Sequence, residues 1–298
     1  MGNPSPRRLD ALMLGFTAYM ADRRVRPLAR ETRYGYRNRV SNAIRIAQEG
    51  GHSLLADDVR TLRFVLGKVS PHPTTRNGYI AALETFYDFL IVQGLRSTNP
   101  AREVGRSRDI KHAPRPLDRD ACERYLAAAV ELGPTFEIIA TLGLYQGWRR
   151  SEMRYARWSW FFTADGGAWC DVTGKGNRTA RVPVHSRTLH ALQRLRESHT
   201  DATWLFPSSD LRRAGEPVGG TWFSNAHHQI CERASLPTTL RLHQLRHSFA
   251  TYLRAAGADM AVTQMGLRHA DPKSTAIYMR VFPAELQQAQ ERLSFAPQ

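Results

Sequence analysis

Cysteine is scarce in this chain of 298 residues, and its scarcity narrows what the protein can be. The three cysteines, Cys122, Cys170 and Cys231, stand far apart in the sequence. An odd number of scattered cysteines argues against a disulfide framework and suits a reducing compartment, so we expect a cytoplasmic protein. Their spacing lacks the short intervals of a zinc site, and no zinc site is predicted.

Long apolar runs are also missing. No stretch approaches the roughly 18 apolar residues that a membrane helix needs, and we expect no contact with a membrane. The start, MGNPSPRRLDALM, carries two arginines but no long apolar segment or small-residue cleavage site. We therefore expect neither a signal peptide nor an anchor. Apolar residues make up 42% of the chain, which is ordinary for a globular protein, and the length allows two domains.

Acidic residues are few relative to basic ones. The chain has 42 Lys and Arg against 27 Asp and Glu, a net charge of +15. Such an excess is typical of a protein that binds a polyanion, although a generally basic surface would give the same total. Residues 1–116 contain 20 basic and 10 acidic residues, whereas residues 117–298 contain 22 and 17. The N-terminal part is therefore predicted to hold phosphates more strongly.

Apolar residues at helical spacing predict four helices in the first 100 residues, over residues 9–22, 30–48, 57–68 and 74–94. The second would expose Arg30, Arg33, Arg37 and Arg45 on one side, although solvation alone explains any single exposed arginine. Residues 101–116 are basic and nearly free of apolar side chains, with two prolines near the end. We expect a helical DNA-clamp domain over 1–100, a basic linker over 101–116 and a second domain over 117–298.

The second domain combines helices with a short hairpin. Helices are predicted after Asp118 and from Pro134, and two strands are predicted over residues 168–173 and 181–184. The turn between these strands is rich in glycine and presents Lys175, one of only four lysines in the chain. A final amphipathic helix would pack on its own domain or on a neighbouring protomer. The expected fold class is mainly α with a small β-hairpin or sheet (α+β).

A group of polar residues near the C-terminus suggests phosphate chemistry. His243 and Arg246 stand three residues apart, so on a helix they share a face and can converge on one anion. His269 follows, and Tyr278 lies nine residues later; a phenol can form a phosphate ester and leave again without a cofactor. The plain alternative is an amphipathic helix with polar residues in solvent.

Two further polar groups allow more than one interpretation. Arg149 precedes a short predicted helix, whose free backbone N–H groups favour an anion, but Arg149 could equally be an ion-pair partner of Glu152. The other is the pair His227 and His228, where a metal site is not predicted.

The ordered set GWRRSE, TGKGN, HQLRH and His-x8-Tyr resembles the tyrosine recombinases, also called phage integrases, and the chain is similar to their Xer branch in size and layout. Each motif is weak alone, but all of them in this order are highly specific. One departure is that Gly266 stands three residues before His269, in GLRH, whereas the family usually has Gly directly before this His. The site residues that the resemblance implies are Arg149, Lys175, His243, Arg246, His269 and Tyr278.

The resemblance also implies a reaction. Two arginines would hold the phosphodiester, Tyr278 would attack it with His243 as base, Lys175 would protonate the leaving 5′ oxygen, and His269 would bind a phosphate oxygen. The substrate would be double-stranded DNA joined by a tetramer through a 3′-phosphotyrosyl intermediate, with no cofactor, metal or small-molecule substrate. A type IB topoisomerase and a non-catalytic DNA-binding regulator are the alternatives from other classes.

Overall fold

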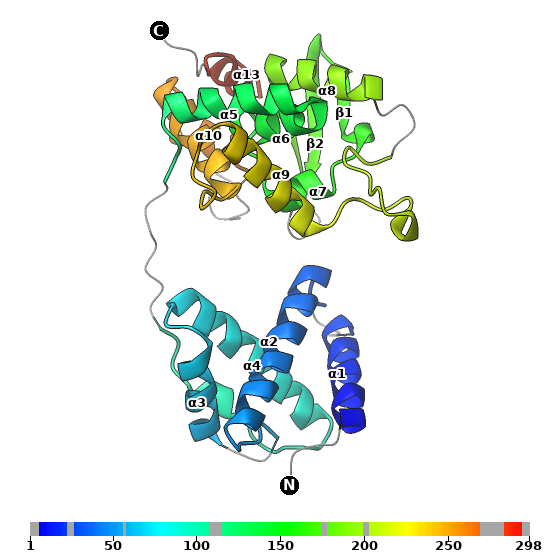
Figure 1. Cartoon of the computed structure of the whole chain (residues 1–298), viewed down its shortest axis with the longest axis vertical. Coiled ribbons are helices and arrows are strands. Elements are labelled where there is room, and N and C mark those ends of the chain that lie inside the picture. Colours follow the sequence, from blue (N-terminus) through cyan, green and yellow to red (C-terminus); the bar gives the residue numbers. More distant parts are fainter. Residues whose placement is uncertain are drawn as a thin grey trace. The chain divides into compact units, whose positions relative to one another are not determined.

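The computed structural model describes residues 6–22, 27–55, 58–107, 115–174, 178–198, 203–268 and 283–293. The chain divides into two units, residues 1–112 and 113–298, each with its own apolar core (Figure 1). Helices dominate the described residues of both units, and the sheet lies in the second. The predicted α+β class, mainly α with a small sheet, is confirmed. No helix among the described residues is long and apolar enough to cross a membrane.

The first unit contains the four helices that apolar spacing predicts. They are α1 (Pro6–Ala21), α2 (Arg30–Glu49), α3 (Val59–Val69) and α4 (Pro73–Val92). Phe16 of α1 packs edge-on against Phe86 of α4, with ring centroids 5.2 Å apart, and also contacts Phe89. Such contacts bury large apolar rings, which contribute most of the stability of a small helical unit.

The surface of α2 is basic, as the sequence predicts, with one exception. Arg30, Arg37 and Arg45 are exposed, but Arg33 is only partly so. Residues that follow α4 also pack on this unit. Ala101 of the short helix η1 (Pro100–Glu103) is buried, and Arg106 pairs with Glu84 of α4.

The second unit is built around α6 (Pro134–Leu144), whose residues are buried from Glu137 to its end. A helix that is apolar on all sides has to be covered by neighbours. Those neighbours are α5 (Arg119–Leu132), α8 (Ser186–Ser198), α9 (Gly220–Arg233) and α10 (His243–Ala255). The Asp118 side chain accepts from the Ala121 N–H at 2.7 Å, so the predicted cap is present.

One antiparallel sheet of three strands lies beside these helices. It has the order β1 (Phe161–Ala164), β2 (Gly167–Thr173) and β3 (Thr179–Pro183). The sequence predicts the second and third strands but misses the first, which pairs Phe161 with Cys170. The hairpin that joins β2 to β3 closes with a hydrogen bond from the Gly174 N–H to the Arg178 carbonyl at 2.9 Å.

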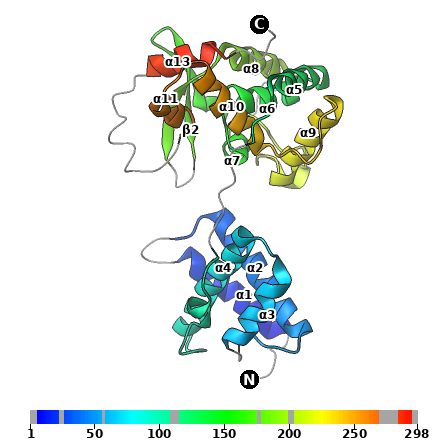
Figure 2. The same cartoon turned by 90° about the vertical axis from the view of Figure 1, so that its left-hand side faces the viewer.

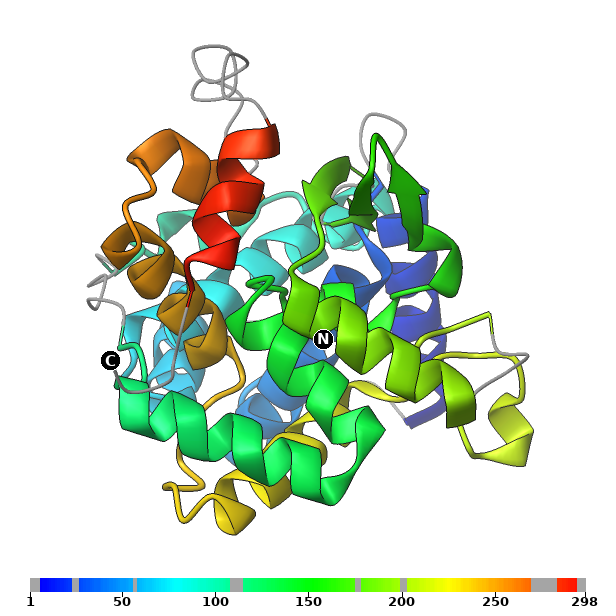
Figure 3. The ribbon, with the colours of Figure 1, turned by 90° about the horizontal axis from the view of Figure 1, so that it is seen from above.

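The last described helix, α13 (Pro283–Glu291), packs on its own unit, between α11 (Met260–Gly266) and β3 (Figures 2 and 3). Leu286 is fully buried, and a Cβ on Gly266 would lie 3.1 Å from its Cδ1. The side chain of Gln290 donates to the Tyr145 carbonyl.

Close packing of α6 on α10 fixes the helix that carries His243 and Arg246, and Gly143→Ala tests it. A Cβ on Gly143 would lie 2.6 Å from Leu245 Cδ1 and 2.9 Å from Leu245 Cβ. Overpacking of this kind costs about 1–3 kcal/mol, so the free energy of unfolding should fall by that amount in urea titrations. Gly220→Ala, which adds a Cβ with nothing within 4 Å, should change it by less than about 0.5 kcal/mol. Equal values for the two variants would contradict the close approach.

Candidate active site

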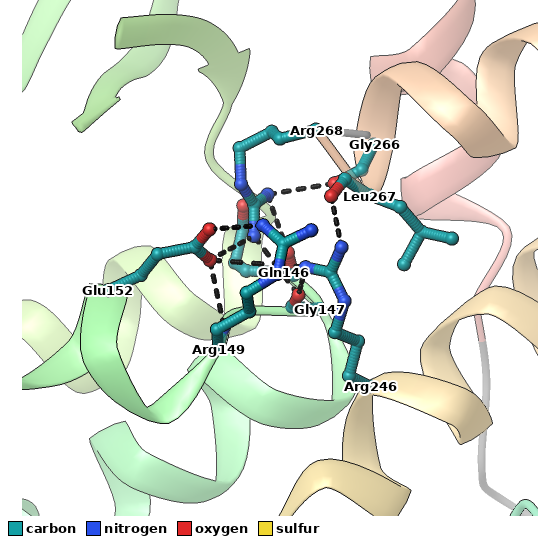
Figure 4. Close-up of polar contacts among 8 residues, drawn as sticks. All are labelled: Gln146, Gly147, Arg149, Glu152, Arg246, Gly266, Leu267 and Arg268. Carbon is teal, nitrogen blue, oxygen red and sulfur yellow. Dashed lines mark hydrogen bonds and ion pairs between the residues drawn. The ribbon is translucent and has the colours of Figure 1, made fainter. Parts of the chain in front are cut away.

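Glu152 lies beside a cluster of three arginines in the second unit (Figure 4). It belongs to the short helix α7 (Arg150–Arg154), and its side chain is only 1% exposed. Its carboxylate accepts from the backbone N–H of Arg149 at 2.8 Å and from the guanidinium of Arg149 at 2.6 Å. The ion pair that the sequence allows between these two residues is therefore present, while 31% of the Arg149 side chain remains exposed.

Arg246 reaches the same centre from α10. Its side chain is 3% exposed and lies 3.9 Å from the Glu152 carboxylate. Its guanidinium donates to the carbonyl oxygens of Gly147 and Leu267. The plain interpretation of HQLRH as a solvated helix face is thus wrong for Arg246, which faces inward.

Arg268 supplies a third guanidinium from the residues that follow α11. It donates to Glu152 Oε2 at 2.8 Å and to the carbonyl oxygens of Gln146, Gly147 and Gly266. The carbonyl of Gly147 therefore accepts from both Arg246 and Arg268. These contacts join three segments that are far apart in the sequence.

The cluster carries an excess of positive charge, with three arginines around one carboxylate. Burial acts to raise the pKa of Glu152, but the charge of Arg268 and hydrogen bonds from Arg149 and Arg268 outweigh it and hold the pKa below its ordinary value. Burial, followed by repulsion from Arg268 and Arg149, lowers the pKa of Arg246 to about 9, which leaves it charged at neutral pH. An anion placed among these arginines would relieve their mutual repulsion.

His243 is the first residue of α10 and is exposed, one turn before Arg246. Its ring contacts His247 edge-on, with centroids 4.7 Å apart. Burial, then His247, Arg246 and Arg149, lowers the pKa of His243, so the imidazole is neutral at pH 7 and can accept a proton.

Three predicted site residues, Lys175, His269 and Tyr278, lie outside the described residues, whereas Arg149, His243 and Arg246 lie within them. The residue before Lys175 borders the arginine cluster, because a Cβ on Gly174 would lie 3.4 Å from Glu152 Oε1. The residue before His269 is Arg268, a member of that cluster.

The sequence prediction missed the positions of Glu152 and Arg268 at this centre. From the sequence, Glu152 is predicted only as a possible ion-pair partner of Arg149. Arg268 could have been noticed, because it occupies the place directly before His269 where the family usually has glycine.

Comparison with known proteins is consistent with this geometry. The model of the phage integrase family matches residues 116–285, more than half of the chain and all of the described arginine cluster. The chain belongs to the phage integrase family. Its predicted identity as a tyrosine recombinase, and hence as an enzyme, is confirmed. Neither a type IB topoisomerase nor a non-catalytic regulator is favoured.

Similar recombinases cover most of the chain. Tyrosine recombinase XerD of Caulobacter vibrioides is 30% identical over 282 residues, which are 86% of this chain and 88% of the relative. Tyrosine recombinase XerC of Erythrobacter litoralis is 31% identical over 80% of each chain. A lambda integrase tetramer bound to a Holliday junction shares the fold, with a TM-score of 0.65 and 16% identity over 88% of this chain and 77% of that one.

Removal of Glu152 should destabilise this recombinase strongly. Glu152→Ala would leave the three arginines without their shared counterion, and breaking a buried ion pair costs about 3–5 kcal/mol. Glu131→Ala provides the control, since Glu131 and its partner Arg233 are both more than half exposed. That exposed pair should contribute no more than about 1 kcal/mol. Chemical denaturation of both variants measures the difference, and similar losses would show that Glu152 does not hold the cluster together.

Proposed function

We propose that this recombinase cleaves and rejoins double-stranded DNA at specific sites through a 3′-phosphotyrosyl intermediate. The observation that carries the proposal is the convergence of Arg149 and Arg246 on one buried carboxylate, with His243 one turn from Arg246 on the same helix. Guanidinium groups remain charged and donate two parallel hydrogen bonds, which suits a phosphodiester. In this proposal Arg149 and Arg246 stabilise the negative charge that develops on the nonbridging oxygens.

Tyr278 is the proposed nucleophile. A phenol has a pKa of about 10, so its proton has to be removed as it attacks phosphorus. Neutral His243 is the proposed base, and His269 is proposed to bind a phosphate oxygen. The phosphotyrosyl ester conserves the energy of the broken DNA bond, so rejoining by the freed 5′ hydroxyl needs no cofactor.

Lys175 is proposed as the acid that protonates the leaving 5′ oxygen. The described ends of its hairpin support this role, because Gly174 borders Glu152. A lysine next to this cluster can approach the same phosphate from the side of the sheet.

The first unit is proposed to bind the DNA backbone. Arg30 and Arg37 are exposed on α2 beside Tyr34, which is 66% exposed. Basic and aromatic side chains in this arrangement suit phosphate and sugar contacts. We further propose a tetramer on paired DNA sites, supported by the lambda integrase tetramer bound to a Holliday junction, and a cytoplasmic location in agreement with three free cysteines.

Tyr278→Phe tests the nucleophile. Phenylalanine keeps the ring but has no oxygen to attack phosphorus, so DNA binding should persist while covalent attachment is lost. A DNA substrate nicked near the cleavage site should trap the wild-type protein as a covalent complex on a denaturing gel. Trapping of the Phe variant on the same DNA would rule out Tyr278.

A sulfur-substituted substrate separates Lys175 from the arginines. Sulfur at the 5′ bridging position is a better leaving group that needs no acid, so Lys175→Ala should cleave it nearly as fast as the wild type. The same variant should be slow on ordinary DNA. Arg149→Ala and Arg246→Ala should remain about 10²- to 10³-fold slow on both substrates. Rescue of an arginine variant by sulfur, or no rescue of Lys175→Ala, would contradict this assignment.

A further inference from the structure

Arg268 has no role in the proposed reaction, yet it makes more polar contacts in the arginine cluster than Arg149 or Arg246 does. Its four contacts are with Gln146 O at 3.1 Å, Gly147 O at 3.0 Å, Gly266 O at 2.8 Å and Glu152 Oε2 at 2.8 Å. Figure 4 shows its guanidinium beside Glu152 and Arg149.

The backbone of Arg268 adopts a conformation that costs energy. Its φ is +52°, in the left-handed region that glycine occupies freely and arginine rarely does. Such strain persists only where surrounding contacts over-determine it, and it is concentrated at functional sites. Here the guanidinium contacts hold the strained residue in place, so the side chain and the backbone conformation depend on each other.

The two arginines that are hydrogen-bonded to Glu152 differ in the exposure of their side chains. The Arg268 side chain is 5% exposed, whereas that of Arg149 is 31% exposed. Both Nη atoms of Arg268 already have protein acceptors, and the remaining Nε–H is buried, so this guanidinium is poorly placed to bind a DNA phosphate. Arg149 is partly accessible, and among the described residues its side chain donates to one protein acceptor, Glu152.

We propose that Arg268 is a positioning residue that serves as the permanent counterion of Glu152, so that Arg149 can transfer its guanidinium to a DNA phosphate. This inference rests on the proposed function, because it concerns how the phosphate-binding arginine becomes available. Arg268 itself does not touch the substrate.

The physical reason lies in the cost of an unpaired buried charge. If Arg149 alone neutralised Glu152, its movement to a phosphate would leave a buried carboxylate with only Arg246 at 3.9 Å. Phosphate and carboxylate would then compete for one cation. With Arg268 in place, Glu152 keeps an ion pair at 2.8 Å throughout, and the competition is weaker.

Arg268→Gly is the direct test. Glycine accepts the positive φ without strain, so this variant removes the guanidinium but also removes the backbone penalty. Single-turnover cleavage of the nicked substrate at saturating protein should fall about 10²-fold, the loss typical of a misplaced catalytic group. Arg268→Lys keeps the charge but loses the planar guanidinium, so its cleavage rate should lie between those of the wild type and Arg268→Gly. Ser235→Gly, at an exposed residue that also has a positive φ (+53°), controls for relief of strain and should cleave like the wild type.

Glu152→Gln in the Arg268→Gly background distinguishes positioning from simple structural support. The amide keeps the size of Glu152 and an oxygen for the Arg149 N–H but carries no charge to retain Arg149. The double variant should recover at least about tenfold in cleavage rate over Arg268→Gly, within the coupling expected for residues in contact. If Arg268 only supports the fold, the losses of the two single variants should multiply, and that result would overturn the proposal. Wild-type cleavage by Arg268→Gly would also overturn it.

Measurements of unfolding test the role of Arg268 independently of the proposed function. Formation of the covalent DNA adduct by the wild type tests the recombinase chemistry. The ratios of cleavage rates between the variants test the positioning role of Arg268. The same four proteins, namely wild type, the two single variants and the double variant, also give a cycle of unfolding free energies that does not depend on cleavage. Additive losses in that cycle would show that Arg268 and Glu152 are not coupled and would overturn the proposal even if the wild type cleaves DNA.

Discussion

The organisation of the second unit depends on one buried carboxylate. Glu152 has to be neutralised because an isolated charge in the protein interior is expensive, and the cations that neutralise it come from three separate segments. Arg149 precedes α7, Arg246 comes from α10, and Arg268 follows α11. The carboxylate therefore does more than balance charge, since together with the carbonyl oxygen of Gly147 it joins these segments to one another. The groups proposed to bind phosphate are held ready before DNA arrives, which is the condition for electrostatic catalysis.

Features that depend on neighbouring residues could be predicted from the sequence. The helix cap at Asp118, the start of α6 at Pro134 and the four helices of the first unit follow from local spacing and capping rules. The pairing of β2 with β3 follows from the glycine-rich turn. The sequence motifs also identified the family, because their order along the chain is more specific than any single motif.

Features that depend on contacts between distant segments could not be predicted. The strand β1 lies in a run of aromatic residues that has no alternating pattern, and it becomes a strand by pairing with β2. The burial of Arg246 depends on acceptors at Gly147 and Leu267, which are 99 and 21 residues away. Residues 101–107 look like linker by composition, yet they find partners on α4. In each case a contact with a distant segment determines the structure, and local composition does not indicate that contact.

The packing of α13 has a consequence for the kinetics of the reaction. Leu286 anchors this helix next to Gly266, and Arg268 is anchored at Glu152, so both flanks of residues 269–282 are attached to the same unit. This segment carries Tyr278. The proposed nucleophile is therefore delivered by a segment that is attached at both ends, and releasing either attachment, at Leu286 or at Arg268, should slow its proposed attack on the phosphate.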